Sequence, residues 1–222
     1  MSLRPYPEVM AGYDEREAYA ERALNPERRA AVERYAGRVT VDVGCGNGTY
    51  VLQLGGERKL FGADGHRFEA WDAAPERFLV SDAARLPLAG ASVDTILCFE
   101  TLEHLPDPTG ALAEYRRVTR GRLVLTVPNC QTTPGMRKSN LVFGHWVDRT
   151  HRNFYDLNTI TAYVEAAGFR VVEARYINRI DLFPFLGEAL HIPAAAVRVM
   201  RKALRPVVRS YLMTCLVVGE AV

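Results

Sequence analysis

The chain has 222 residues, of which 48% are hydrophobic and 24% charged, and its formal net charge at pH 7 is +2. These values fit one globular domain of ordinary to generous size, and they give no reason to expect nucleic acid as the main partner. No apolar run approaches the roughly 20 residues of a membrane span, and the polar, proline-broken start does not resemble a signal peptide. The four cysteines are far apart and no histidine is spaced as a metal partner, so we expect free thiols, no metal and a cytoplasmic location.

Residues 1–37 are expected to form a helical cap ahead of the first strand. Asn25 and Pro26 are typical of a helix start, and this helix should run to about Tyr35 and stop at Gly37. It could lie across the mouth of a ligand site or merely cover the sheet. The sequence favours neither position.

Residues 39–54 combine a strand, a glycine-rich loop and the start of a helix. Alternating valines are followed by three glycines within five residues: Val39, Val41, Val43, Gly44, Gly46 and Gly48. Glycine lets the backbone approach a ligand closely, and a helix N-terminus favours an anionic group. The spacing G-x-G-x-G after Asp42 therefore predicts a cofactor loop. Thr49 stands where a dinucleotide fingerprint would need its third glycine.

Strand and helix signals alternate after this loop. Strands are expected at residues 59–63, 78–80, 93–99 and 123–127, with helical stretches between them, the clearest from Thr109 to Val118. A helix beginning near Asp156 and ended by Gly168, a strand at about 170–177 and a last strand at 212–218 follow. This alternation predicts an α/β fold with a parallel sheet covered on both faces.

Acidic residues recur at or near the ends of four successive predicted strands: Asp42, Asp64, Asp82 and Glu100. In open parallel sheets, ligands bind outside the carboxyl ends of the strands. We therefore expect these four acids on one rim, where a ligand rich in hydrogen-bond donors would offset their crowding. Taken singly, Asp64 could be a turn residue and Asp82 a helix cap; together they favour a binding site.

Five segments carry a family resemblance by their order and spacing. They are Asp42-Val43-Gly44-Cys45-Gly46-Asn47-Gly48, Ala63-Asp64-Gly65-His66, Ser81-Asp82-Ala83-Ala84-Arg85-Leu86-Pro87-Leu88, Ser92-Val93-Asp94 and Phe99-Glu100-Thr101-Leu102-Glu103-His104-Leu105-Pro106-Asp107-Pro108. Over residues 38–176 the chain resembles the class I S-adenosylmethionine-dependent methyltransferases, especially the branch of ubiquinone-type and other small-molecule O- and C-methyltransferases. The resemblance implies a Rossmann-like three-layer sandwich with a seven-stranded, mostly parallel sheet and an antiparallel last strand.

The resemblance also implies a cofactor site for S-adenosylmethionine. Its residues would be Asp42, Gly44, Cys45, Gly46, Asp64, Gly65, His66, Asp82, Ala83, Phe99, Glu100 and Thr101. The first four would lie along the methionine part, with Asp42 placing its ammonium group. Asp64 and the two residues after it would meet the ribose. Asp82 would accept from the adenine amino group, the next backbone N–H would meet a ring nitrogen, and the last three residues would line the floor.

Residues 129–222 are expected to hold the methyl acceptor. The long connection at 128–155 is of the kind that forms lids and binding loops. If the acceptor is a hydroxyl, a base must take its proton, and histidine suits neutral pH. The candidates are His151, His145 and His104, and we favour His151 because Asp148 could orient its ring. Purely structural roles for His151 and His104 stay open.

A basic amphipathic segment occupies residues 186–209. Between residues 194 and 210 it has five cations and no acid: Arg198, Arg201, Lys202, Arg205 and Arg209. Such a segment could lie on anionic lipid, as a peripheral membrane contact, or recognise an anionic acceptor. The interpretation that we prefer is a solvated helix face over a core.

The sequence thus predicts a single domain over 1–222, with the cofactor-binding half at 38–128 and the acceptor-binding half, including a helical insertion, at 129–222. The predicted function is methyl transfer from S-adenosylmethionine to a small molecule, with O-methylation favoured over C-methylation. The alternatives are an NAD-dependent oxidoreductase, disfavoured by Thr49 and Asp82, and a non-catalytic cofactor-binding module. No oligomeric state follows from the sequence.

Overall fold

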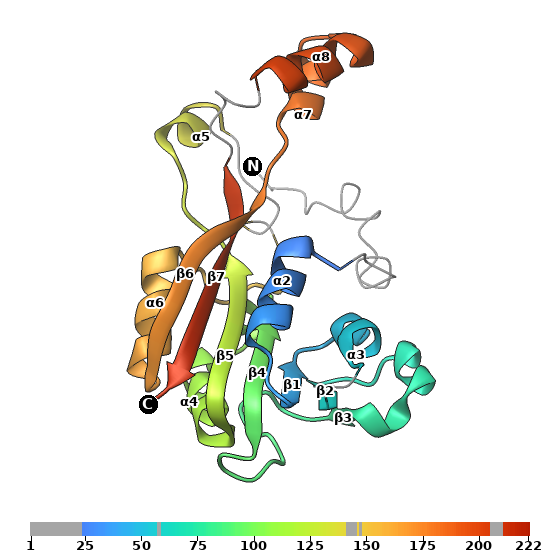
Figure 1. Ribbon diagram of the computed structural model, residues 1–222. Helices are drawn as coiled ribbons and strands as arrows, with labels where there is room; N and C mark the ends of the chain where they lie inside the picture. The colour runs from blue at the N-terminus through green and yellow to red at the C-terminus, as the bar shows by residue number, and fades with distance from the viewer. Residues whose placement is uncertain (1–23, 57–58, 141–145, 147, 205–210) are drawn as a thin grey trace, which may run out of the picture.

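The computed structural model describes residues 24–56, 59–140, 146, 148–204 and 211–222. Its centre is one seven-stranded sheet in the order β3-β2-β1-β4-β5-β7-β6 (Figure 1). The strands are β1 (Val39–Val43), β2 (Lys59–Asp64), β3 (Phe78–Val80), β4 (Val93–Phe99), β5 (Thr119–Pro128), β6 (Phe169–Arg179) and β7 (Leu212–Ala221). β7 is antiparallel to β5 and β6, and the other paired strands are parallel. The predicted sheet is confirmed, including its antiparallel last strand.

Helices cover both faces of the sheet and make three layers. Helices α4 (Pro108–Val118) and α6 (Leu157–Ala166) pack on one face, and α2 (Pro26–Tyr35) and α3 (Thr49–Leu54) pack on the other. β4 serves both cores, since Ile96 and Cys98 point to the first and Leu97 and Phe99 to the second. Burial on both faces explains why the strand is nearly continuously apolar.

Local signals place the ends of two helices where the sequence predicted them. The Asn25 side chain accepts hydrogen bonds from the backbone N–H groups of Glu27 and Arg28, at 3.1 and 3.0 Å, and so caps α2. Gly168 follows the end of α6 with φ of +90°, a conformation that favours glycine. The expectation for residues 1–23 of the helical cap lies outside the described residues.

Two expected helices are absent from the described part of the chain, and the prediction of helical stretches between all these strands is wrong there. β2 and β3 are joined by two 3-10 turns, Glu69–Ala73 and Pro75–Arg77, and β3 and β4 by a loop. Pro75 interrupts the first connection, and Pro87 and Gly90 the second. Proline and glycine disfavour continued α-helix, so these connections stay irregular.

The basic C-terminal segment does not cover a core, which corrects the interpretation preferred from the sequence. It contains α7 (Phe183–Ala189) and α8 (Ala194–Leu204), and α8 buries none of its residues. Figure 1 shows both helices beyond the end of β6, away from the sheet. α8 packs instead on α7, where a Cβ on Gly187 would lie 2.5 Å from a Val197 methyl carbon. Residues 205–209 of this segment lie outside the described residues.

Candidate functional site

The strand order reverses between β1 and β4, and this reversal creates a crevice at the carboxyl end of the sheet. β1 pairs with β2 on one side and with β4 on the other, both in parallel. After β1 and after β4 the chain turns toward opposite faces of the sheet, so the loops that follow these two strands separate. The glycine loop follows β1 and Glu100 follows β4. The glycine loop and Glu100 therefore lie at the place where this class of sheet binds ligands.

Glycine is required in the loop after β1 because the loop is held tightly between its neighbours. Gly44, Gly46 and Gly48 have φ of 75°, 52° and 73°. A Cβ on Gly44 would lie 2.1 Å from Oγ1 of Thr101, the residue two positions after β4. The N–H of Gly44 donates to the Ala63 carbonyl of β2 at 2.7 Å. The loop thus joins the ends of β1, β2 and β4.

Asp64, at the end of β2, supports the same loop. Its carboxylate accepts hydrogen bonds from the backbone N–H groups of Gly46, at 2.9 Å, and His66, at 3.2 Å. Gly65 and His66 are exposed beside it. The Cys45 N–H donates to the Ala63 carbonyl at 3.2 Å, and burial raises the pKa of the Cys45 thiol. Cys45 is therefore a protonated thiol that fills the loop.

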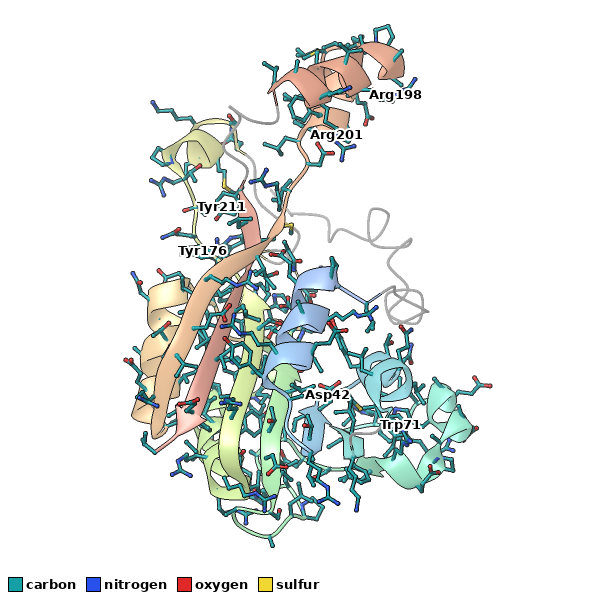
Figure 2. All side chains as sticks on the ribbon, in the orientation of Figure 1. Asp42, Trp71, Tyr176, Arg198, Arg201 and Tyr211 are labelled. Atoms are coloured by element: carbon teal, nitrogen blue, oxygen red, sulfur yellow. The ribbon has the colours of Figure 1, made fainter. Side chains whose placement is uncertain are left out.

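The buried Trp71 side chain fixes the outer side of the loop. Its indole N–H donates to the Gly46 carbonyl at 2.8 Å, and its ring stacks on Phe78 of β3 with centroids 4.8 Å apart. Figure 2 shows Trp71 on the connection outside β2 and β3, and Asp42 deeper in the sheet. Sequence reasoning did not single out Trp71, because its partner lies well before it in the chain.

Asp42 is held in an environment that disfavours its charge. The side chain is 2% exposed, and burial raises the pKa of its carboxyl group to about 8, with a further increase from the charge of Asp64 and an opposing effect of Arg28. Asp42 is therefore mostly protonated at pH 7. A cation bound beside it would draw its proton off.

Arg28 is a candidate site residue that sequence reasoning missed. Its guanidinium lies 2.6 Å from a carboxylate oxygen of Glu100 and stands over the Phe99 ring, 5.7 Å from the centroid. The Tyr50 ring packs against the same phenylalanine, with centroids 5.0 Å apart. Helix α2 therefore both covers the sheet and reaches the rim. The sequence predicted the start of α2 but not its docking beside β4, which depends on tertiary packing.

The far end of the rim is an open cleft beside Asp82. Asp82 is exposed, and its carboxylate accepts from the backbone N–H of Ala84 at 2.8 Å, which makes it a turn residue rather than a helix cap. The cleft has a volume of about 220 Å³, and its lining residues are Asp82, Ala84, Arg85, Leu105, Pro106, Asp107 and Gly110. Ala83, next to Asp82, is half-buried and packs against the core. The apolar residues that line the cleft, Leu105 and Pro106, directly follow His104 in the chain.

Two of the three histidine candidates lie together beside the end of β4. The His104 and His151 rings meet edge to face with centroids 4.7 Å apart. Oγ1 of Thr150 lies 3.0 Å from Nδ1 of His104, and an Asp148 oxygen lies 3.5 Å from Nε2 of His151. The nearness of Asp148 to His151, expected from the sequence, is thus observed. His145 lies outside the described residues.

Backbone hydrogen bonds hold this pair in place. The N–H groups of Arg152 and Asn153 both donate to the Glu103 carbonyl, at 2.8 and 3.0 Å. The side-chain amide of Asn153 also donates to the Leu105 carbonyl, at 2.7 Å. The segment around His151 is therefore fastened to the turn that carries His104, the 3-10 turn Leu102–His104.

His104 is the more accessible of the two histidines. Its side chain is 32% exposed, against 7% for His151. Burial, and then the neighbouring His151, lower the pKa of His104 below its ordinary value, so the ring is neutral at pH 7. A carboxyl oxygen of the buried Glu103 lies 3.9 Å from Nε2 of His104, and burial, followed by the Glu100 charge, raises the pKa of Glu103. The described residues offer no hydrogen-bond partner to either Glu103 carboxyl oxygen.

The same three side chains could also hold a metal ion. One ligand atom from each of Glu103, His104 and His151 lies within 4.8 Å of the other two. Carboxylate and imidazole are ligands for several divalent metals. The sequence predicted no metal because His151 is far from the other two along the chain.

The first prediction concerns the tight loop. We expect Gly44→Ala to lower the free energy of unfolding by about 1–3 kcal/mol, because the positive φ and the clash with Thr101 both oppose a Cβ. Gly65→Ala is the matched control, since nothing lies within 4 Å of its added Cβ. Urea unfolding of both variants measures the difference. Equal stability of the two variants would contradict this description of the loop.

The second prediction concerns Asp42. Because its pKa is about 8 in the free protein, binding of a ligand that places an ammonium group beside it should release a proton at pH 7, and affinity should rise with pH toward 8. Calorimetric titration with S-adenosylhomocysteine in buffers of different ionisation enthalpy measures the proton release. Asp42→Asn should abolish it. Binding without proton release at pH 7 in the parent protein would contradict the assignment.

Comparison with known proteins gives a family match over most of the chain. A family described as a methyltransferase domain matches residues 14–174. The ubiquinone biosynthesis O-methyltransferase of Methylococcus capsulatus is 32% identical over 112 residues, which cover 44% of this chain and 47% of that protein. A probable S-adenosylmethionine-dependent methyltransferase of Mycolicibacterium smegmatis is 30% identical over 148 residues, covering 62% and 54%. The chain thus spans about half the length of the curated relatives it matches.

Solved structures show the same fold. The crystal structure of an S-adenosylmethionine-dependent methyltransferase from Archaeoglobus fulgidus superposes with a TM-score of 0.63 over 97% of both chains, at 17% sequence identity. At that identity the likeness concerns the fold alone.

Proposed function

The chain belongs to the methyltransferase domain family, and we propose that it transfers the methyl group of S-adenosylmethionine to a hydroxyl group of a small-molecule acceptor. The observation that carries the proposal is the meeting of Asp42, Asp64 and Glu100 with the glycine loop at the crevice between β1 and β4. Three carboxyl groups at one rim suit a ligand with several donors and positive charges. We also propose that residues 1–222 form a single domain, divided into cofactor and acceptor halves as the sequence suggests.

The proposed position of the cofactor runs along the rim from α2 to β3. Its ammonium group would lie at Asp42, and its carboxylate at Arg28, whose partner Glu100 would be left facing the sulfonium. The ribose hydroxyls would donate hydrogen bonds to the Asp64 carboxylate, and the adenine would enter the cleft beside Asp82. Each contact pairs a group of the cofactor with a side chain of complementary charge or hydrogen-bonding capacity.

Methyl transfer needs little covalent help from the protein. S-adenosylmethionine supplies a methyl carbon already activated by the adjacent sulfonium, so the protein contributes mainly proximity and orientation. A hydroxyl acceptor must also lose its proton. We assign that step to His104, because it is neutral at pH 7 and more exposed than His151. His151, the residue favoured from the sequence, would position the His104 ring, with Asp148 beside it.

The alternatives have less support. An NAD-dependent oxidoreductase would suit Asp64 equally well, but it leaves Asp82 unexplained, and Thr49 replaces the third glycine of its fingerprint. A non-catalytic module would keep the rim but would not need a neutral, partly exposed histidine beside it. Turnover with any acceptor excludes the second alternative.

The third prediction tests the cofactor. Calorimetry should show binding of S-adenosylhomocysteine and no comparable binding of NAD. Asp64→Ala and Asp82→Ala should each weaken the binding of S-adenosylhomocysteine by roughly 1.5–3 kcal/mol, because hydrogen bonds to a charged group are lost. Asp72→Ala, which removes an exposed carboxylate paired with Arg67, is the matched control and should bind like the parent. Unchanged affinity in both test variants would refute the placement of the cofactor.

The fourth prediction tests the base. Against a panel of hydroxylated acceptors, His104→Gln should lower turnover by a factor on the order of 10²–10⁴ while S-adenosylhomocysteine still binds normally. His151→Gln should lower turnover by a smaller factor, because His151 acts through His104. In the parent, turnover plotted against pH should fall on the acid side only below the ordinary histidine pKa of about 6.5, because the pKa of His104 is lowered. Normal turnover by His104→Gln would exclude it as the base.

A further inference from the structure

The insertion between β6 and β7 leaves the domain at the same rim as the candidate site. β6 runs in the direction of β5, because both are antiparallel to β7. Its last residue, Arg179, therefore lies at the carboxyl end of the sheet, and the chain continues into α7 and α8. Figure 1 shows these two helices standing clear of the sheet, with the short helix α5 (Pro134–Lys138) at the same end of the molecule.

One face of α7 is apolar and exposed. Leu182, Phe185 and Leu186 follow the i, i+3, i+4 spacing of one helix face, and Leu190 extends it by one turn. Phe185 is 52% exposed and Leu190 63%. On α8, Val199 is 69% exposed. Large apolar side chains gathered in this way on one small element mark an interaction surface rather than a stable free surface.

Cations lie on the neighbouring helix α8 and on α5, at the same end of the molecule. Arg198, Arg201 and Lys202 lie on one face of α8 and are exposed, and Figure 2 shows Arg198 and Arg201 on the insertion. In α5, Arg137 and Lys138 are also exposed. Residues 131–140 and 179–204 together hold six lysines and arginines against two carboxylates, Asp181 and Glu188. Asp181 is already paired with Arg201, at 2.9 Å.

We propose that the α7–α8 insertion docks on an anionic lipid bilayer. Its exposed leucines and Phe185 enter the interface between headgroups and acyl chains, while the cations of α8 and α5 contact the anionic headgroups. Charge complementarity selects this occupant over a second copy of the chain, because two such basic faces repel each other. The described helices include none that is both long enough and apolar enough to cross the membrane.

This inference narrows the acceptor, and that part rests on the proposed function. The insertion leaves the sheet at its carboxyl end, which is also the end that carries the His104–His151 pair. An acceptor with a long apolar tail, held in the bilayer, could present a hydroxyl group there without crossing water. The substrate class that we infer is therefore a membrane-held lipophilic molecule with a polar, hydroxylated head.

The fifth prediction is the test of this docking surface. The full chain should sediment with vesicles that contain phosphatidylglycerol at low salt, bind pure phosphatidylcholine vesicles much less, and be released by high salt. Phe185→Ser with Leu190→Ser, and separately Arg198→Glu with Lys202→Glu, should each lower partitioning by about tenfold or more. Val172→Ser and Lys59→Glu, exposed on β6 and at the opposite end of the sheet, are the matched controls and should bind like the parent.

Three results would overturn the docking surface: no vesicle binding at low salt, equal binding by the test variants and the parent, or a dimer in sedimentation equilibrium that the Phe185→Ser, Leu190→Ser variant dissociates. S-adenosylhomocysteine binding reports separately on folding and on the proposed function, and all variants should retain it. A parent that binds vesicles but not S-adenosylhomocysteine would refute the proposed function and leave the docking surface standing.

Discussion

The contact between Gly44 and Thr101 is the constraint on which the rest of the site depends. It fixes the loop after β1 against the end of β4, at the point where the strand order reverses. A side chain at residue 44 would push these two segments apart. The same approach brings the Gly46 N–H to Asp64 and leaves Asp42 enclosed. The absence of a Cβ at residue 44 thus permits the close approach of the loop after β1 to the end of β4.

Each acidic group on that rim is held, in the free protein, by an arrangement that contacts with a ligand can replace. Asp42 stays protonated because its burial disfavours the charge, Asp64 accepts from backbone N–H groups, and Glu100 pairs with Arg28. Each of these arrangements uses groups of the protein alone. Each also leaves a group that a cationic, donor-rich cofactor can engage more strongly. The free protein is in this sense already organised for binding.

Much of this fold could be predicted from sequence because the information is local. β4 is buried on both faces and so reads as an apolar run, and Asn25 caps α2 through its own side chain. The acids at strand ends could be assigned to one rim because parallel strands share a direction. Contacts between segments that are distant along the chain could not be predicted in this way. Examples are the contact of Arg28 with Glu100 and that of His104 with the segment of His151.

The C-terminal insertion shows a different limit. The periodicity of residues 194–204 predicts an amphipathic helix, and α8 is one. Periodicity alone does not say what the apolar face meets, and the common case of a helix over a core led to the wrong expectation. The position of α8 depends on where β6 ends and on Gly187, which lets Val197 pack closely on α7.

The most direct test of the cofactor position is the crystal structure of the protein with S-adenosylhomocysteine. We predict the ligand in the crevice between β1 and β4, with its ribose hydroxyls on the Asp64 carboxylate, its ammonium group at Asp42 and its adenine in the cleft beside Asp82. A ligand bound elsewhere, or a crevice left empty at saturating S-adenosylhomocysteine, would contradict this position.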